Sequence, residues 1–359
     1  MRVLRRIIIT LFVIMGLLSI FLGVSFSSNM APVDKNSKDE IIVEIPIGSS
    51  TKDIAKILEE KELIKNKDFF YYYARINKIN NLKASTYKLN KTMSLTEIIN
   101  VLSQGNNYNP DMIVITFQEG INFRKIASII EKNTNNTKED VYNLVSDKTY
   151  LDELIDKYWF ITNDIKNNNI YYPLEGYLYP ETYFLDNKDV SVKEIFEIML
   201  NEMGKKLEPL KEAIQKKGIS VHEFLTLASI IELEGYRIED KANIASVFYN
   251  RINKKMSLGS DVTTYYAFKV DMNERDLLIS EINTYNPYNT RGPKMEGKIP
   301  IGPVSIPSYD SINAAVNPTD TKYLYFVADK NRKVYFTKTY NEHLQKIKEL
   351  KNKGVWFEW

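Results

Sequence analysis

Apolar and charged positions are interspersed along most of the chain, but one stretch near the amino terminus is apolar without interruption. Residues 7–26, IIITLFVIMGLLSIFLGVSF, carry no charge, and about 20 residues at 1.5 Å each cross a hydrocarbon core. Arg2, Arg5 and Arg6 precede it. By the positive-inside rule we predict a cytoplasmic tail at 1–6, a transmembrane anchor at 7–27, a polar linker at 28–40, and an extracytoplasmic remainder. The alternative is a cleavable signal peptide, for which SFSSNMAPV offers a poor site.

A second pattern, alternating apolar residues followed by a glycine turn and an amphipathic helix, occurs twice. VEIPIGSSTKDIAKIL, from Val43, aligns with VITFQEGINFRKIASII, from Val114, when Gly48 is laid over Gly120. Each copy predicts a strand, a turn and a helix. The first copy continues through the tyrosine-rich helix FFYYYARI, a strand at 84–89, and a helix at 94–102 headed by an S-x-x-E capping box. The fold class is therefore α+β, with a small domain at 41–108 and a larger mixed domain at 109–359. The aromatic residues 69–73 fit a core and its rim, and carbohydrate stacking stays open.

The stretch FLTLASIIELEG, residues 224–235, predicts a buried helix that carries one acidic side chain among small and apolar neighbours. Leu225, Ala228, Ser229 and Glu232 share one face. Burial raises the pKa of a carboxylic acid, so we expect Glu232 to stay protonated and able to act as a general acid. Glu234 points the other way, because two residues turn a helix by about 200°. The alternative for Glu232 is a cap or an ion pair at the helix end.

The rest of the chain gives further elements. We predict helices at 191–217, 242–253 and 340–352, a loop from 259 to 266, and a hairpin around 330–332 that builds the sheet beneath a cleft. Residues 171–183, YYPLEGYLYPETY, form an aromatic, stiff segment of the kind that lines sugar clefts, or else a structural loop.

Composition removes several classes of chemistry. Lys and Arg number 48 against 46 Asp and Glu, so nothing favours nucleic acid as a partner. The absence of cysteine excludes thiol nucleophiles, disulfides and thiolate zinc sites. With only His222 and His343, a three-histidine metal site is impossible. We expect neither a metal nor a cofactor.

Seven blocks carry a resemblance across the whole chain: LEGYLYPETY, LASIIELEG, IASVFYNRI, SDVTTYY, PYNTRG, IPIGPVSIPS and KYLYFVAD. In this order they resemble the endolytic murein transglycosylase (YceG-like) family. The resemblance implies a membrane anchor, a LysM-like small domain and a catalytic domain outside the cytoplasmic membrane. It also implies cleavage of the MurNAc-GlcNAc β-1,4 bond in nascent peptidoglycan without water, leaving 1,6-anhydro-MurNAc ends and terminating strand elongation. The partners implied are glycan strands, the membrane, and peptidoglycan synthases of the elongation or division machinery.

The resemblance places the catalytic acid at Glu232, which would protonate the leaving oxygen and then take a proton from the muramyl 6-hydroxyl. Candidates for gripping the sugar, or for bracing those that do, are Glu234, Asn250, Asp261, Thr263, Tyr266, Tyr288, Asn289, Thr290, Tyr179 and Glu181. The family commonly has glutamine where Gly259 stands and proline-glycine where the loop ends in IPS with Ser308. Two alternatives remain: a hydrolase with Asp261 or Glu181 as second carboxylate, and a non-catalytic scaffold that binds peptidoglycan.

Overall fold

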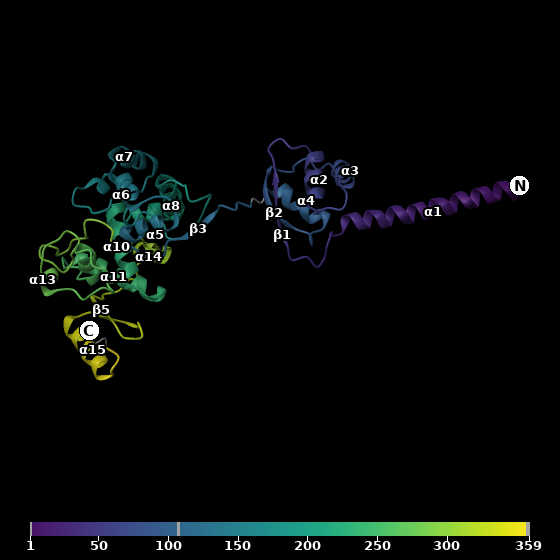
Figure 1. Cartoon of the computed structure of the whole chain (residues 1–359). Coiled ribbons are helices and arrows are strands. Elements are labelled where there is room, and N and C mark those ends of the chain that lie inside the picture. The colour runs from purple at the N-terminus through teal and green to yellow at the C-terminus, as the bar shows by residue number, and fades with distance from the viewer. Residues whose placement is uncertain (1, 106–107, 357–359) are drawn as a thin grey trace. The chain divides into compact units, whose positions relative to one another are not determined.

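The computed structural model describes residues 2–105 and 108–356, which fall into two compact units, Met1–Asp111 and Met112–Trp359 (Figure 1). Each unit has its own hydrophobic core. The described residues leave out Met1 of the predicted tail, residues 106–107 of the predicted small domain and residues 357–359 of the predicted larger domain. They also leave out the side chains of residues 2–8.

The chain begins with one long helix, α1 (Arg2–Met30). Its Ile9–Met30 segment is long and apolar enough, by length and composition, to cross a membrane. The helix continues beyond the predicted anchor into the first residues of the predicted linker. Its apolar side chains from Ile9 to Val24 are exposed, which fits a helix whose surroundings are apolar.

The small unit contains β1 (Glu40–Ile45), α2 (Thr51–Glu60), α3 (Lys67–Ile76), β2 (Ser85–Asn90) and α4 (Leu95–Gln104). The two strands pair antiparallel, with Val43 opposite Tyr87. The predicted capping box at Ser94 and Glu97 is confirmed. The predicted order of elements is also confirmed; the LysM-like character of this unit stays a prediction.

The larger unit opens with β3 (Ile113–Thr116), which pairs antiparallel with β4 (Thr182–Leu185). Between them lie α5 (Phe123–Asn133), α6 (Lys138–Ser146), α7 (Lys148–Lys157) and the short 3-10 helix η1 (Asn163–Lys166). The predicted repeat is confirmed, because β3 leads into α5 as β1 leads into α2. Gly48 and Gly120 both adopt positive φ, at 87° and 75°, in the left-handed region that glycine tolerates best.

Helices form most of the remainder: α8 (Val192–Leu207), η2 (Glu208–Leu210), α9 (Lys211–Gln215), α10 (Val221–Glu234), α11 (Ile238–Asn253), α12 (Asp261–Ala267), α13 (Ile279–Ile282) and α14 (Tyr309–Val316). The predicted single helix at 191–217 was wrong: the α-helix ends at Leu207, just before Pro209, which has no backbone N–H to continue it. The predicted loop at 259–266 was also wrong, since α12 begins at Asp261. In Figure 1, α10 lies at the centre of the unit, and it packs against α11 and α14.

The chain ends with β5 (Tyr325–Ala328), β6 (Val334–Thr337) and α15 (Tyr340–Asn352). The hairpin and the last helix are confirmed. The hairpin builds no sheet beneath a cleft, however, because β5 and β6 pair only with each other within the described residues. They pack instead on α15 and, through β5, on α11.

Candidate active site

The central helix α10 delivers Glu232 to the site. Its first turn is fixed by a capping box between Ser220 and Glu223, and its side chains from Phe224 to Ile231 are buried in the core. Glu232 lies in the last turn, and its side chain is only 9% exposed. A carboxylate held so far from water needs hydrogen-bonding partners.

Those partners come from two other helices. Ser308, the N-cap of α14, donates to Glu232 Oε2 through its backbone N–H at 2.9 Å and its hydroxyl at 2.5 Å. Ser311 Oγ donates to the same oxygen at 2.7 Å. Lys241 Nζ, on α11, lies 3.2 Å from Oε1 and 3.1 Å from Oε2. Oε2 therefore receives four donors, whereas Oε1 has Lys241 as its one hydrogen-bond partner among the described residues.

These contacts correct the expectation that Glu232 is protonated at rest. Burial works to raise the pKa of the Glu232 carboxyl. The hydrogen bonds from Ser308 and Ser311 and the nearby Lys241 ammonium outweigh burial and hold that pKa below its usual value. The surroundings are also less apolar than predicted. The alternative of an ion pair at the helix end is thus part of the observed geometry.

Lys241 reaches Glu232 because Gly235 leaves room for it. A Cβ at Gly235 would lie 2.7 Å from Lys241 Cγ, a distance that real Cβ contacts do not show. The lysine side chain is 6% exposed, and its Nζ also donates to Ser308 Oγ at 3.0 Å. Lys241, Ser308 and the two Glu232 oxygens therefore form one closed cluster.

The turn between β3 and α5 lies against Glu232. A Cβ at Gly120 would be 3.7 Å from Glu232 Cγ and 3.4 Å from Leu233 Cδ2. Gly120 lines a hollow of about 600 Å³ together with Leu233, Tyr266 and residues of α5. The preceding residue, Glu119, lines a second hollow of about 520 Å³ with Tyr179 and Glu181. Glu232 itself lines neither, but the turn beside it borders both.

Glu119 is a second carboxyl group near Glu232. Partial burial raises its pKa, and the negative charge of Glu232 raises it further, with smaller effects from Asp310 and Glu181 and an opposing one from Lys241. Sequence reasoning missed this residue. A signal was present, since the second copy of the repeat has an acid before its turn glycine where the first copy has Ile47.

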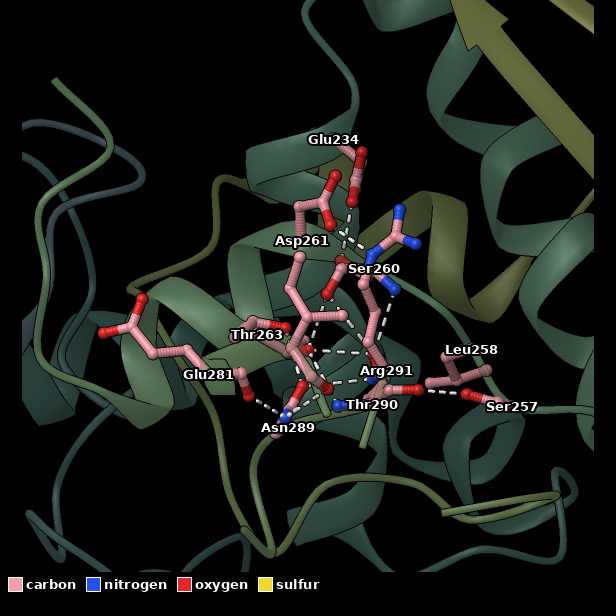
Figure 2. Close-up of polar contacts among 12 residues, drawn as sticks. Glu234, Ser257, Leu258, Ser260, Asp261, Thr263, Glu281, Asn289, Thr290 and Arg291 are labelled. Atoms are coloured by element: carbon pink, nitrogen blue, oxygen red, sulfur yellow. Dashed lines mark hydrogen bonds and ion pairs between the residues drawn. The ribbon is translucent and has the colours of Figure 1, made fainter. Parts of the chain in front are cut away.

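Five of the predicted site residues lie together in a polar network that joins the end of α10, α12 and the segment around Thr290 (Figure 2). Glu234 Oε1 accepts a hydrogen bond from Ser260 Oγ at 2.6 Å, and Asp261 forms an ion pair with Arg291. The hydroxyls of Thr263 and Thr290 lie 2.8 Å apart. Burial and the neighbouring Asp261 carboxylate raise the pKa of Glu234. Glu232 and Glu234 contact different elements, so their predicted opposite orientation is confirmed.

Asn289 connects this network to the backbone of residues 281–284. Its amide nitrogen donates to three backbone oxygens, at 2.8 Å for Thr284, 3.0 Å for Glu281 and 3.2 Å for Ile282. Its oxygen accepts from Thr264 at 2.6 Å. The Asn289 side chain is buried and fully hydrogen-bonded, which is the geometry of a brace.

The remaining predicted residues are spread over other parts of the unit. Tyr266 lines the larger hollow and donates to Glu175 at 2.9 Å, and the buried ring of Tyr288 packs against it. Tyr179 and Glu181 line the smaller hollow. Asn250 donates to the backbone oxygens of Thr321 and Tyr323, and so holds the segment that leads to β5.

Sequence reasoning did not find Lys241 or Ser311, and it treated Ser308 only as a turn residue. Glu232 and Ser308 are 76 positions apart, and no local pattern connects them. Among the described residues, no group of three or more histidine, aspartate or glutamate side chains could hold a metal ion.

Comparisons with known proteins agree with one another. A profile of the YceG-like family matches residues 43–349. The chain is 38% identical to the endolytic murein transglycosylase of Bacillus subtilis over 90% of this chain and 88% of that protein. It is 34% identical to the endolytic murein transglycosylase of Streptococcus pneumoniae serotype 2 over 90% of this chain and 61% of that protein. A crystal structure of a putative yceG-like protein from Listeria monocytogenes matches with a TM-score of 0.60 and 37% identity, covering 86% of this chain and 100% of that one.

Proposed function

The chain belongs to the YceG-like family, and from that premise we propose that it cuts murein glycan strands internally as a membrane-anchored enzyme. Its relatives are named endolytic murein transglycosylases, so the enzyme class is that of the lytic transglycosylases, which are lyases, and the substrate is peptidoglycan. The bond cut is the MurNAc-GlcNAc β-1,4 linkage, and the product carries a 1,6-anhydro-MurNAc end.

The reaction needs one group that gives a proton and takes it back. Glu232 protonates the leaving glycosidic oxygen, and the bond from that oxygen to the muramyl C1 breaks. The muramyl 6-hydroxyl then attacks C1 and loses its proton to Glu232. No water is consumed, so the two products together have the mass of the substrate strand.

The single observation that most supports Glu232 as the proton carrier is the unequal number of hydrogen bonds to its two oxygens. Oε2 is saturated by Ser308, Ser311 and Lys241. Among the described residues Oε1 accepts only from Lys241, and we assign the moving proton to the remaining lone pair of Oε1. The ionised resting state is the form that the first step leaves behind and that accepts the 6-hydroxyl proton in the second step. Glycan binding excludes water, which raises the pKa of Glu232 and favours uptake of the proton needed for the first step.

The two hollows support an internal cut. They lie on consecutive residues, Glu119 and Gly120, of the turn that touches Glu232. A strand that occupies both hollows runs past Glu232 with sugars on either side of it, as endolytic cleavage requires. Tyr266 contributes to one side, and Tyr179 and Glu181 contribute to the other.

Most of the other predicted site residues act indirectly in this proposal. The network of Glu234, Asp261, Thr263 and Thr290, with Asn289 below it, fixes α12 at the wall of the larger hollow. Helix α1 serves as the anchor that keeps the enzyme beside newly made strands, where a cut terminates elongation. We also propose that the enzyme contacts peptidoglycan synthases.

The test is digestion of purified glycan strands by the full chain in detergent, with the products weighed by mass spectrometry. Wild type is expected to yield internal fragments with anhydro ends, each one water lighter than a reducing end. Glu232→Gln is expected to abolish cleavage, and Glu239→Gln, an exposed acid on neighbouring α11, should leave it intact. Full cleavage by Glu232→Gln would show that Glu232 is not the acid. Binding of glycan without cleavage by wild type would favour a non-catalytic scaffold.

A hydrolase is the second candidate, and Glu119 suits the role of second carboxylate better than Asp261 does. Asp261 is paired with Arg291, whereas the Glu119 carboxyl is coupled to Glu232 itself. A hydrolase needs a second carboxylate to activate water. Products with reducing ends, lost in Glu119→Gln, would establish this reading.

A further inference from the structure

Helix α3 of the small unit has one apolar face buried in the core and a second apolar stripe that the core covers only in part. Phe70 and Ala74 are buried in the core. On the other face Phe69, Tyr72, Tyr73 and Ile76 follow the i, i+3, i+4, i+7 spacing of a helical stripe. On this outer face Phe69 and Tyr73 are half-buried and also pack on the core, whereas Tyr72 is 58% exposed and Ile76 is 77% exposed. Exposed apolar residues gathered in one stripe indicate a binding surface.

This outer face begins where the apolar part of α1 ends. The ring of Phe26 on α1 lies 5.4 Å from that of Phe69, edge to face, and 6.4 Å from that of Tyr73. Lys65, just before α3, donates from Nζ to the backbone oxygen of Ser28 at 2.9 Å. A membrane-spanning α1 would therefore place the stripe at the level where its apolar segment leaves the hydrocarbon.

We propose that the outer face of α3 lies in the interfacial layer of the lipid bilayer, so that the small unit rests on the membrane surface. This inference rests on the proposed anchoring role of α1. Tyrosine suits such a position, because its ring packs among acyl chains while its hydroxyl stays hydrated. Arg75 and Lys78, at the same end of α3 as Ile76, provide positive charge for anionic phospholipid headgroups.

A glycan strand is the other occupant that tyrosines can bind. The stripe begins and ends with Phe69 and Ile76, which offer a sugar no hydrogen bond, and it is continuous with an apolar helix. Both features favour lipid. The experiment below includes glycan as a competing outcome.

The chain has no cysteine, so single cysteines can be labelled without background. Ile76→Cys and, as a second probe, Tyr72→Cys are labelled with a polarity-sensitive fluorophore, and the full chain is placed in vesicles of anionic and zwitterionic phospholipid. The matched control is Ile47→Cys, 97% exposed. It follows the Ile45 end of β1, which pairs with Ser85, opposite the Glu40 end where the chain arrives from α1. Leu18→Cys, within Ile9–Met30, reports on the anchor.

In vesicles, the labels at 76 and 72 are expected to emit at shorter wavelength than the same fluorophore does in buffer without detergent. Brominated lipid should quench both of them. The label at 47 should emit as it does in water. If the label at 18 is quenched and those at 76 and 72 remain water-like, the inference is wrong and the anchor stands. If the label at 18 is also water-like, the anchor itself fails. A change at 72 and 76 that requires added glycan would assign the face to sugar and overturn the lipid assignment.

Discussion

At the scale of single residues, the protein keeps a carboxylate where water hardly reaches by surrounding it with donors. A buried ion pair repays its desolvation only when further hydrogen bonds satisfy the charges. Glu232 meets that condition with three donors besides the lysine, all directed at Oε2. The arrangement fixes the orientation of the carboxylate and leaves Oε1 with Lys241 as its one partner among the described residues.

Lys241 should set the pH range of the reaction. Lys241→Met removes a positive charge that lowers the pKa of Glu232, so that pKa rises and the acid form persists to higher pH. The alkaline limb of the pH profile of kcat/KM is therefore expected to move upward, whatever happens to the maximal rate. The measurement is the rate of glycan cleavage across pH.

Lys241→Arg is the control for this change. It retains the charge and should retain the limb near its wild-type position, even if the larger guanidinium lowers the maximal rate. An alkaline limb at the same pH in wild type and Lys241→Met would show that Lys241 does not tune the proton-carrying group.

Glu175 should make stability depend on pH. Burial raises its pKa to about 8 against hydrogen bonds from Phe123 and Tyr266 that lower it. Between the unfolded value of about 4.3 and 8, the folded chain retains a proton that the unfolded chain releases, so the stability contribution falls as pH rises. Glu175→Gln cannot ionise and should lack this fall, which is on the order of a few kcal/mol. Urea unfolding of both proteins at pH 5 and pH 8 measures the difference, and parallel changes in the two would contradict it.

At the scale of elements, local signals predicted what local forces determine. The repeat of strand, glycine turn and helix, the capping box at Ser94 and the final helix were all readable, because each depends on residues a few positions apart. The partners of Glu232 were not readable in this way. Lys241 and Ser308 meet it only after α10, α11 and α14 have packed, and a serine in a turn carries no mark of such a role. The surroundings of Glu232 were predicted to be apolar for the same reason, because the sequence pattern shows only its neighbours on α10.

The N-cap of α14 should serve stability and catalysis together. Ser308→Ala removes the cap that accepts from Ser311 N–H, at a cost of about 1 kcal/mol. It also removes a hydroxyl donor to Glu232 Oε2, so the rate of glycan cleavage is expected to fall. Ser191→Ala removes the cap of α8 in the same unit and should cost similar stability with no change in rate. Thermal unfolding and cleavage assays on both variants test the pair, and equal rates in the two would separate Ser308 from the reaction.

At the scale of the whole molecule, the two units keep separate interiors. Leu58 and Tyr87 belong to one core, and Ile230 and Phe248 to the other. Without cysteine there is no disulfide to couple them. Because each unit has its own core, we expect the two units to unfold in separate transitions.

Calorimetry of the full chain in detergent should therefore show two unfolding transitions. Leu58→Ala creates a cavity in the small unit and should lower its transition by an amount that reflects about 2–5 kcal/mol, leaving the larger unit unchanged. Ile230→Ala should do the reverse, since Ile230 is fully buried in the core of the larger unit, on α10 close to Glu232. Loss of glycan cleavage on heating should follow only the transition that Ile230→Ala moves. A single transition lowered by either substitution would mean that the two cores fold as one, and the small unit could not then act independently of the site.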